Sequence, residues 1–202
     1  MNRAGCAYAA IVVLFSLCWK TAAALSWSEG AGFRSAEVHP VSSGKVGFTL
    51  MDPTTTGVGF TNVLQGDAYL TNAVAHNGSG VAIGDVDGDG WADIYLCSLQ
   101  GPNRLYRNLG NWRFEEMDIG EAACADQLST GATFADVDGD GDLDLLVNGI
   151  AAGTRLFLND GKGKWTEVKD SGLSRTASAT SLALADIDGT GTWTFTAPII
   201  ST

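Results

Sequence analysis

An acidic loop recurs along this chain at almost constant spacing. The loop reads DVDGDGWAD over residues 85–93 and DVDGDGDLD over residues 136–144, 51 residues later. A third copy opens as DIDG over residues 186–189, another 50 residues along, and then diverges. A period of roughly 20–50 residues indicates a repeat architecture, in which each copy is one supersecondary unit that packs on its neighbours. The sequence therefore predicts a series of stacked units.

Each complete loop predicts a calcium site. Carboxylates at positions 1, 3, 5 and 9 are too close together to remain without a cation. Ca²⁺ takes roughly six to eight oxygen ligands, whereas Mg²⁺ tolerates such a crowded cage poorly. Glycines at positions 4 and 6 allow the backbone to turn tightly, and the carbonyl at position 7 adds an oxygen. The predicted ligands are Asp85, Asp87, Asp89, Trp91 and Asp93 in the first loop, and Asp136, Asp138, Asp140, Asp142 and Asp144 in the second.

Two other interpretations of the loops fit less well. An EF-hand needs a glutamate at position 12, where Leu96 and Val147 stand. A dockerin-like module also needs helices after the loops, but residues 94–97 and 143–147 are apolar strand formers. A plain polar turn explains one Asp-Gly pair, but not two loops with all four carboxylates.

The third loop is degraded. Asp186 and Asp188 keep positions 1 and 3, while Thr190 and Thr194 occupy positions 5 and 9. Fewer ligand charges weaken calcium binding. We therefore expect two Ca²⁺ sites in the chain and a weakened third.

Four short strands are predicted in each complete copy, which is the size of one β-propeller blade. The predicted class is all-β: an incomplete propeller of two full four-stranded antiparallel blades with partial flanking blades. Aromatic residues matched between copies, Tyr106 with Phe157 and Trp112 with Trp165, are expected in the core. The predicted strands cover residues 81–84, 94–97, 104–108 and 112–116, then 132–135, 143–147, 155–159 and 165–168, then 182–185.

The N-terminus has the composition of a secretory signal. Arg3 precedes an apolar run over residues 7–19, and Ala22–Ala24 are small residues suited to cleavage. The run is shorter than the roughly 20 residues of a membrane-spanning helix, so we expect no transmembrane segment after cleavage. The predicted location is secreted: extracellular, periplasmic or on the cell surface. The expected organisation is a signal peptide at 1–24, a leader or linker at 25–43, an irregular N-terminal hairpin or partial blade at 44–76, repeat 1 at 77–128, repeat 2 at 129–178 and a truncated repeat 3 at 179–202.

The distribution of charge limits the possible partners, and the cysteines allow two redox states. The formal net charge is −11, and 11 of the 23 acidic residues lie in the three loops. The chain has no basic stripe of the kind that nucleic acid requires. Cys97 and Cys124 lie outside the predicted signal and either pair in an oxidising compartment or remain buried thiols; the sequence leaves both open.

No catalytic motif of the GxSxG, HExxH or P-loop type occurs. A calcium enclosed by four carboxylates and a carbonyl has little open coordination for Lewis-acid chemistry. We therefore expect a non-catalytic binding or adhesion scaffold whose partner is an unidentified protein or glycan. The alternative is a fragment of a calcium-dependent extracellular polysaccharide or ester hydrolase or lyase whose catalytic part is missing.

Residues 80–189 resemble the FG-GAP/VCBS repeats of integrin-α-like β-propellers. Segments 77–85 and 103–111 are most similar to the ASPIC/UnbV group. The resemblance implies a propeller, usually seven-bladed, with calcium in loops at one end of the blades. The chain departs from that pattern because it has two full repeats and a stub, and lacks a C-terminal ASPIC/UnbV segment. By motif position, the implied ligands are Asp85, Asp87, Asp89, Asp93, Asp136, Asp138, Asp140 and Asp144.

The residues after Gly189 suggest a shift of reading frame. Read one base back, the codons for residues 190–196 can encode Asp-Gly-Asp-Leu-Asp-x-Tyr, which would complete the third loop; only the Asp at position 194 is forced by the genetic code. The alternative is a diverged terminal repeat. With two full blades, we expect that the chain does not fold stably alone as a closed propeller, because repeats bury their faces against neighbours.

Overall fold

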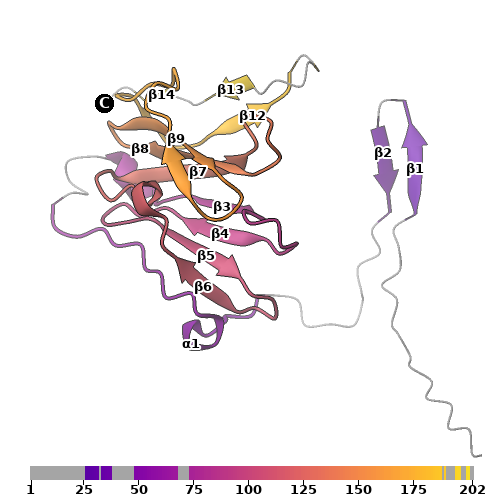
Figure 1. Ribbon diagram of the computed structural model, residues 1–202, viewed down its shortest axis with the longest axis horizontal. Coiled ribbons are helices and arrows are strands. Elements are labelled where there is room, and N and C mark those ends of the chain that lie inside the picture. The colour runs from indigo at the N-terminus through magenta and orange to yellow at the C-terminus, as the bar shows by residue number, and fades with distance from the viewer. Residues whose placement is uncertain are drawn as a thin grey trace, which may run out of the picture. The chain divides into compact units, whose positions relative to one another are not determined.

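The computed structural model describes residues 26–31, 33–37, 48–67, 73–187, 189, 194–196 and 199–200. It separates into two units, residues 1–49 and residues 50–202, whose elements are labelled in Figure 1. The predicted signal peptide at 1–24 lies outside the described residues. Within the described part, no helix is long and apolar enough to cross a membrane.

The first unit contains a hairpin where a leader or linker was expected. Strand β1 (Trp27–Gly30) pairs antiparallel with β2 (Phe33–Ala36), with Trp27 opposite Ala36. The assignment of residues 25–43 as a leader or linker stays a prediction. A two-residue connection containing glycine is a hairpin signal in its own right.

The second unit contains two four-stranded antiparallel sheets, which confirms the predicted all-β class and blade size. Both sheets run in chain order, as Figure 1 shows for β3 to β6. The strands of the first blade are β3 (Val81–Gly84), β4 (Asp93–Leu96), β5 (Arg104–Asn108) and β6 (Phe114–Met117). Those of the second are β7 (Ser129–Ala135), β8 (Asp144–Gly149), β9 (Gly153–Asn159) and β10 (Trp165–Glu167).

The two blades pack against each other and share one core. Tyr95 of β4 meets Phe134 of β7 edge-on, with ring centroids 6.2 Å apart. Phe134 in turn stacks on Trp165 of β10 at 6.2 Å. Burial of apolar surface between the sheets is the main force that joins them. The buried members of this core are Ala82, Val86, Tyr95, Cys97, Leu105, Ile119, Ala122, Cys124, Leu145, Val147, Phe157 and Trp165.

Glycines allow the first strands of successive blades to approach closely. A β-carbon at Gly80, just before β3, would lie 2.7 Å from the Cα of Gly131 in β7. A β-carbon at Gly131 would lie 3.1 Å from the carbonyl oxygen of Thr180. The same contact thus recurs from the first blade to the second and from the second to the residues beyond it.

Hydrogen bonds also join the blades. Asn159 at the end of β9 donates its Nδ2–H to the carbonyl of Val86, at 2.7 Å, in the first acidic loop. Buried Asn103 donates to the hydroxyl of Ser129 at 2.9 Å. The backbone N–H of Ser129 donates to the carbonyl of Ser98 at 2.9 Å. These bonds fix the blades' relative register.

A charge network joins the third and fourth strands of the second blade, and the side chains of Arg155 and Glu167 at its centre are buried. Arg155 of β9 donates to both carboxylate oxygens of Glu167 in β10, at 2.9 and 2.8 Å. Arg175 donates to Glu167 at 2.7 Å, and Asp126 accepts from Arg155 at 2.7 Å. The bonds from Arg155 lower the pKa of Glu167 to about 2. The Arg155 guanidinium also lies 5.1 Å from the ring centre of Phe157.

Only pairs of short strands follow the second blade among the described residues. Strand β11 (Ser178–Ala179) pairs with β14 (Ile199–Ile200), and β12 (Ala183–Ala185) pairs with β13 (Thr194–Thr196). Ala185 lies opposite Thr194, just as Gly84 lies opposite Asp93 in the first blade. The register therefore confirms that Thr194 occupies position 9 of the third loop.

Residues 48–67 contain no strand, so a hairpin is not formed in this part of segment 44–76. Instead, Asp52 caps the one-turn helix α1 (Pro53–Thr56) by accepting from the N–H of Thr54. Proline at the first helical position and a carboxylate cap favour a helix start over a strand turn. Gly57 ends α1 with φ +82° and lies against the backbone of Phe114 in β6. The other short helices among the described residues are η1 (Ala73–Asn77) and η2 (Gly120–Ala123).

One predicted pair of matched aromatics is wrong. Tyr106 and Phe157 are both buried, as expected, but Trp112 is 69% exposed. Asn108 pairs with Phe114 and Asn159 with Trp165, so Phe114 is the true counterpart of Trp165. At the constant offset of 51 residues between copies, Trp112 corresponds to Gly163, which lies in the turn between the third and fourth strands of the second blade.

Cys97 and Cys124 are free thiols in the shared core. Burial raises the pKa of each to about 12. Thiols with so high a pKa carry almost no thiolate near neutral pH, and thiolate is the reactive form.

Candidate metal centres

The two acidic loops connect the first and second strands of each blade, β3 to β4 and β7 to β8. In the first loop, oxygens of Asp85, Asp87 and Asp89 lie within 4.8 Å of one another. In the second, oxygens of Asp136, Asp138 and Asp144 do so. Two ligands on opposite sides of a calcium ion, each at roughly 2.4 Å, are about 4.8 Å apart. Both groups therefore fit one ion of this size.

The aspartate at position 1 of each loop accepts hydrogen bonds from backbone N–H groups of the same loop. Asp85 accepts the backbone N–H groups of Asp89 at 3.1 Å and Gly90 at 2.8 Å. Asp136 likewise accepts from Gly139 at 2.7 Å and Gly141 at 3.1 Å. The glycines at positions 4 and 6 have φ between +71° and +97°, the left-handed region that the sequence led us to expect. The loops are thus curled around their carboxylates by backbone hydrogen bonds.

The position 9 aspartates are fully buried and join the loop to the third strand. Asp93 accepts from the N–H of Val86 at 3.0 Å through one oxygen and from that of Asn108 at 2.8 Å through the other. Asp144 does the same with Val137 at 2.8 Å and Asn159 at 3.0 Å. Burial raises the pKa of both carboxyl groups. A buried carboxylate of this kind gains from a nearby cation.

The structure gathers some predicted ligands and separates others. Within the residues that it describes, Asp93 and Asp140 fall outside the two three-residue groups. Asp140 accepts the N–H of Asp142 at 2.9 Å. Asp186 is exposed at the start of the third loop, and Asp188 lies outside the described residues. The ligand roles of all these residues remain predictions.

The side chain at position 7 points to the turn between the third and fourth strands. Trp91 is 53% exposed, and a β-carbon at Gly110 would lie 3.6 Å from its ring. A β-carbon at Gly161 would overlap the carboxylate of Asp142. In both blades, therefore, position 7 is available to the ion only through its backbone carbonyl when the side chain keeps this orientation.

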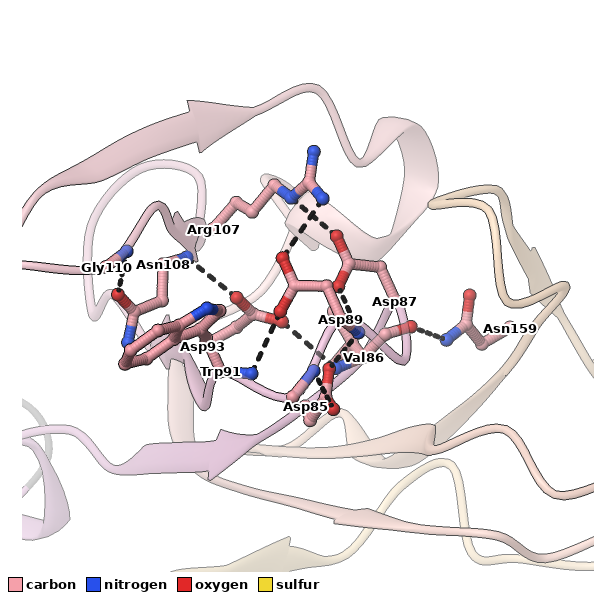
Figure 2. A network of polar contacts seen from close by, with 11 residues as sticks. Asp85, Val86, Asp87, Asp89, Trp91, Asp93, Arg107, Asn108, Gly110 and Asn159 are labelled. Atoms are coloured by element: carbon pink, nitrogen blue, oxygen red, sulfur yellow. Dashed lines mark hydrogen bonds and ion pairs between the residues drawn. The ribbon is translucent and has the colours of Figure 1, made fainter.

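Arg107 is a residue of the first site that the sequence reasoning missed. Its Nε lies 2.5 Å from Asp87 Oδ2, and its Nη2 donates to Asp89 Oδ2 at 3.1 Å (Figure 2). The charge of Asp87 raises the pKa of Arg107. Arg107 lies on β5, next to Asn108, which bonds Asp93. The sequence did contain a signal for this contact. In a four-stranded antiparallel blade, the end of the third strand lies beside the loop that joins the first two strands.

Comparison with known protein families agrees with the repeat. A family model described as an FG-GAP-like repeat matches residues 85–147 and again residues 136–193. The two matches together cover more than half of the chain. The chain belongs to the FG-GAP-like repeat family. Each FG-GAP-like match begins at position 1 of an acidic loop, so the family boundary and the loop coincide.

Two relatives of this FG-GAP-like protein carry the name cartilage acidic protein 1. The one from Xenopus tropicalis is 26% identical over 174 residues, which cover 79% of this chain and 26% of the relative. The one from Homo sapiens is 30% identical over 145 residues, which cover 64% of this chain and 22% of the relative. The chain thus spans about a quarter of the length of these relatives.

Proposed function

We propose that this FG-GAP-like protein binds one Ca²⁺ in each of its two complete acidic loops and acts as a secreted, non-catalytic binding scaffold. The observation that carries the proposal is the repetition of the site. Two loops, 51 residues apart, gather three carboxylates each within the span of one ion. An incidental acidic turn would not recur with the same glycine conformations and the same buried aspartate at position 9.

In this proposal the ion has a structural role. Asp85, Asp87 and Asp89, and likewise Asp136, Asp138 and Asp144, would hold it. The cation would offset the mutual repulsion of these carboxylates and stiffen the connection between the first two strands of each blade. Because the aspartates also accept backbone N–H groups, few oxygens are left to orient a substrate. This supports a scaffold over an enzyme.

Secretion and the partner class belong to the same proposal. The composition of residues 1–24 supports export, and the extracellular, periplasmic or surface environments all supply calcium. The acidic loops disfavour nucleic acid, so the proposed partner is a protein or a glycan.

Calorimetric titration with Ca²⁺ tests the proposal. We expect two bound ions per chain and a melting temperature that rises with calcium, because a ligand that binds the folded state stabilises it. Asp87→Asn and Asp138→Asn should each remove about one ion, since each removes one ligand charge and keeps an oxygen for its local backbone bond. Glu115→Gln, an exposed position outside the loops, is the control and should leave both ions. Absence of calcium-linked heat and of any thermal shift would refute calcium binding.

A further inference from the structure

The two loops differ in one contact from the neighbouring strand. In the first blade, Arg107 of β5 reaches Asp87 and Asp89. The offset of 51 residues places Leu158 of β9 at the same position in the second blade. Among the described residues, no ion pair involves an aspartate of the second loop.

We propose that Arg107 is a built-in cation that competes with the metal ion for the first loop, so that the second loop binds Ca²⁺ more tightly than the first. This inference rests on the proposed function, because it concerns the relative affinity of the same two sites. It assigns Arg107 a specific role: it positions and neutralises the first loop's carboxylates and is not itself a ligand.

The competition follows from shared ligands. Two of the three aspartates grouped in the first loop, Asp87 and Asp89, are the two that Arg107 contacts. An ion that enters must either displace the guanidinium or share its carboxylates with a second positive charge. Either event costs interaction energy. The second loop has Leu158 at the matching position and therefore has no such cost.

The contact can be released without unfolding the blade. The Arg107 side chain is 39% exposed, so it can turn towards solvent. Its Nε makes no hydrogen bond of good geometry despite its proximity to Asp87, so that contact is mainly ionic. Figure 2 shows the guanidinium above the carboxylates of Asp87 and Asp89, away from the Asp93 bonds to Val86 and Asn108. Moving Arg107 therefore leaves the buried bonds of Asp93 in place.

The charge of Arg107 also predicts different metal-free behaviour of the loops. A guanidinium between Asp87 and Asp89 relieves their repulsion without any metal. The second loop has one more carboxylate, Asp142, and no such partner in the described structure. The first loop should stay ordered without calcium, whereas the second should depend on it.

A reciprocal exchange tests the proposal by calorimetry. In the Asp138→Asn background, which leaves the first loop to be observed alone, Arg107→Leu should tighten Ca²⁺ binding by about tenfold or more, equivalent to about 1.4 kcal/mol. In the Asp87→Asn background, Leu158→Arg should weaken binding by the second loop by a similar factor. Arg107→Lys, which keeps the charge, is the matched control and should bind within about threefold of wild type.

A spectroscopic readout follows the first loop separately. Terbium(III) bound there should show emission sensitised by Trp91, and Trp91→Phe should lower that emission. Arg107→Leu should lower the terbium concentration needed for half-maximal emission.

The possible results separate the two proposals. If Arg107→Leu leaves the first-loop affinity unchanged or lowers it while both ions still bind, the role of Arg107 is wrong and calcium binding stands. If Arg107→Leu does not fold, an unchanged second-loop affinity in Leu158→Arg overturns the competition by itself. If neither wild type nor Arg107→Leu binds calcium, the proposed function itself fails.

Discussion

Glu167 is a buried carboxylate whose side chain is 4% exposed and which is held by Arg155 and Arg175. Replacing Glu167 leaves the buried charge of Arg155 with only one carboxylate partner, the exposed Asp126. We expect Glu167→Gln to lower the free energy of unfolding by about 3 kcal/mol at pH 7, measured by urea denaturation. Asp126→Asn is the matched control: Asp126 contacts the same arginine but is 79% exposed. It should cost less than about 1 kcal/mol, and equal losses would contradict the argument.

The same residue gives a pH dependence. The folded-state pKa of Glu167, about 2, is below its ordinary value of 4.5. An acid whose pKa is lowered by folding stabilises the fold above its unfolded pKa, and this stabilisation is lost as the pH falls towards the folded pKa. The stability difference between wild type and Glu167→Gln should therefore be full above about pH 5 and should shrink between about pH 4.5 and pH 2. Urea denaturation over this range measures it; a difference that is constant from pH 7 to pH 2.5 would be inconsistent with this origin.

At the scale of single elements, the turn between β5 and β6 contains a strained residue. Trp112 has φ +61°, a left-handed conformation that costs residues with a β-carbon roughly 1–2 kcal/mol. Gly163 occupies the same position in the second blade with φ +87°. We expect Trp112→Gly to be more stable than Trp112→Ala by about 1 kcal/mol, measured by urea denaturation. Both variants remove the exposed ring, so their difference isolates the backbone conformation. Equal stability of the two would disprove the strain.

The elements also show what the sequence predicts and what it does not. Strands β3 and β5 have the expected bounds, and the acidic loops lie between strands as expected, because alternation and Asp-Gly signals are local. The contacts of Arg107, and the bonds of Asp93 to Val86 and Asn108, depend on which strand ends lie side by side. Such contacts join residues 7 to 20 positions apart, and no local pattern encodes them. Trp112 resembles Trp165 in residue type, but the constant offset of 51 residues aligns Trp165 with Phe114, which is why Trp112 is exposed.

At the scale of the whole molecule, the shared core predicts that the two blades unfold together. Leu145 of β8 is fully buried in this core, which also contains Tyr95 and Leu105 of the first blade. We expect one calorimetric transition for residues 73–179, and Leu145→Ala should shift all of it, with a loss of about 2–5 kcal/mol. Asn159→Ala, which removes the bond to Val86, should lower the same transition by a smaller amount. A second transition that Leu145→Ala leaves unmoved would show that the blades are independent.

The glycine contacts between first strands bear on the geometry of assembly. Where Gly80 meets Gly131, the blades are separated by backbone alone, whereas the rings of Tyr95 and Phe134 separate them elsewhere. Each unit is therefore a wedge, thin at the glycine edge and thick where the rings lie. The angle of that wedge sets how many units complete a full circle. A side chain at Gly131 would thicken the narrow edge, reduce the angle and favour a wider ring, so a single methyl group at this point could change the symmetry of an assembly built from these repeats.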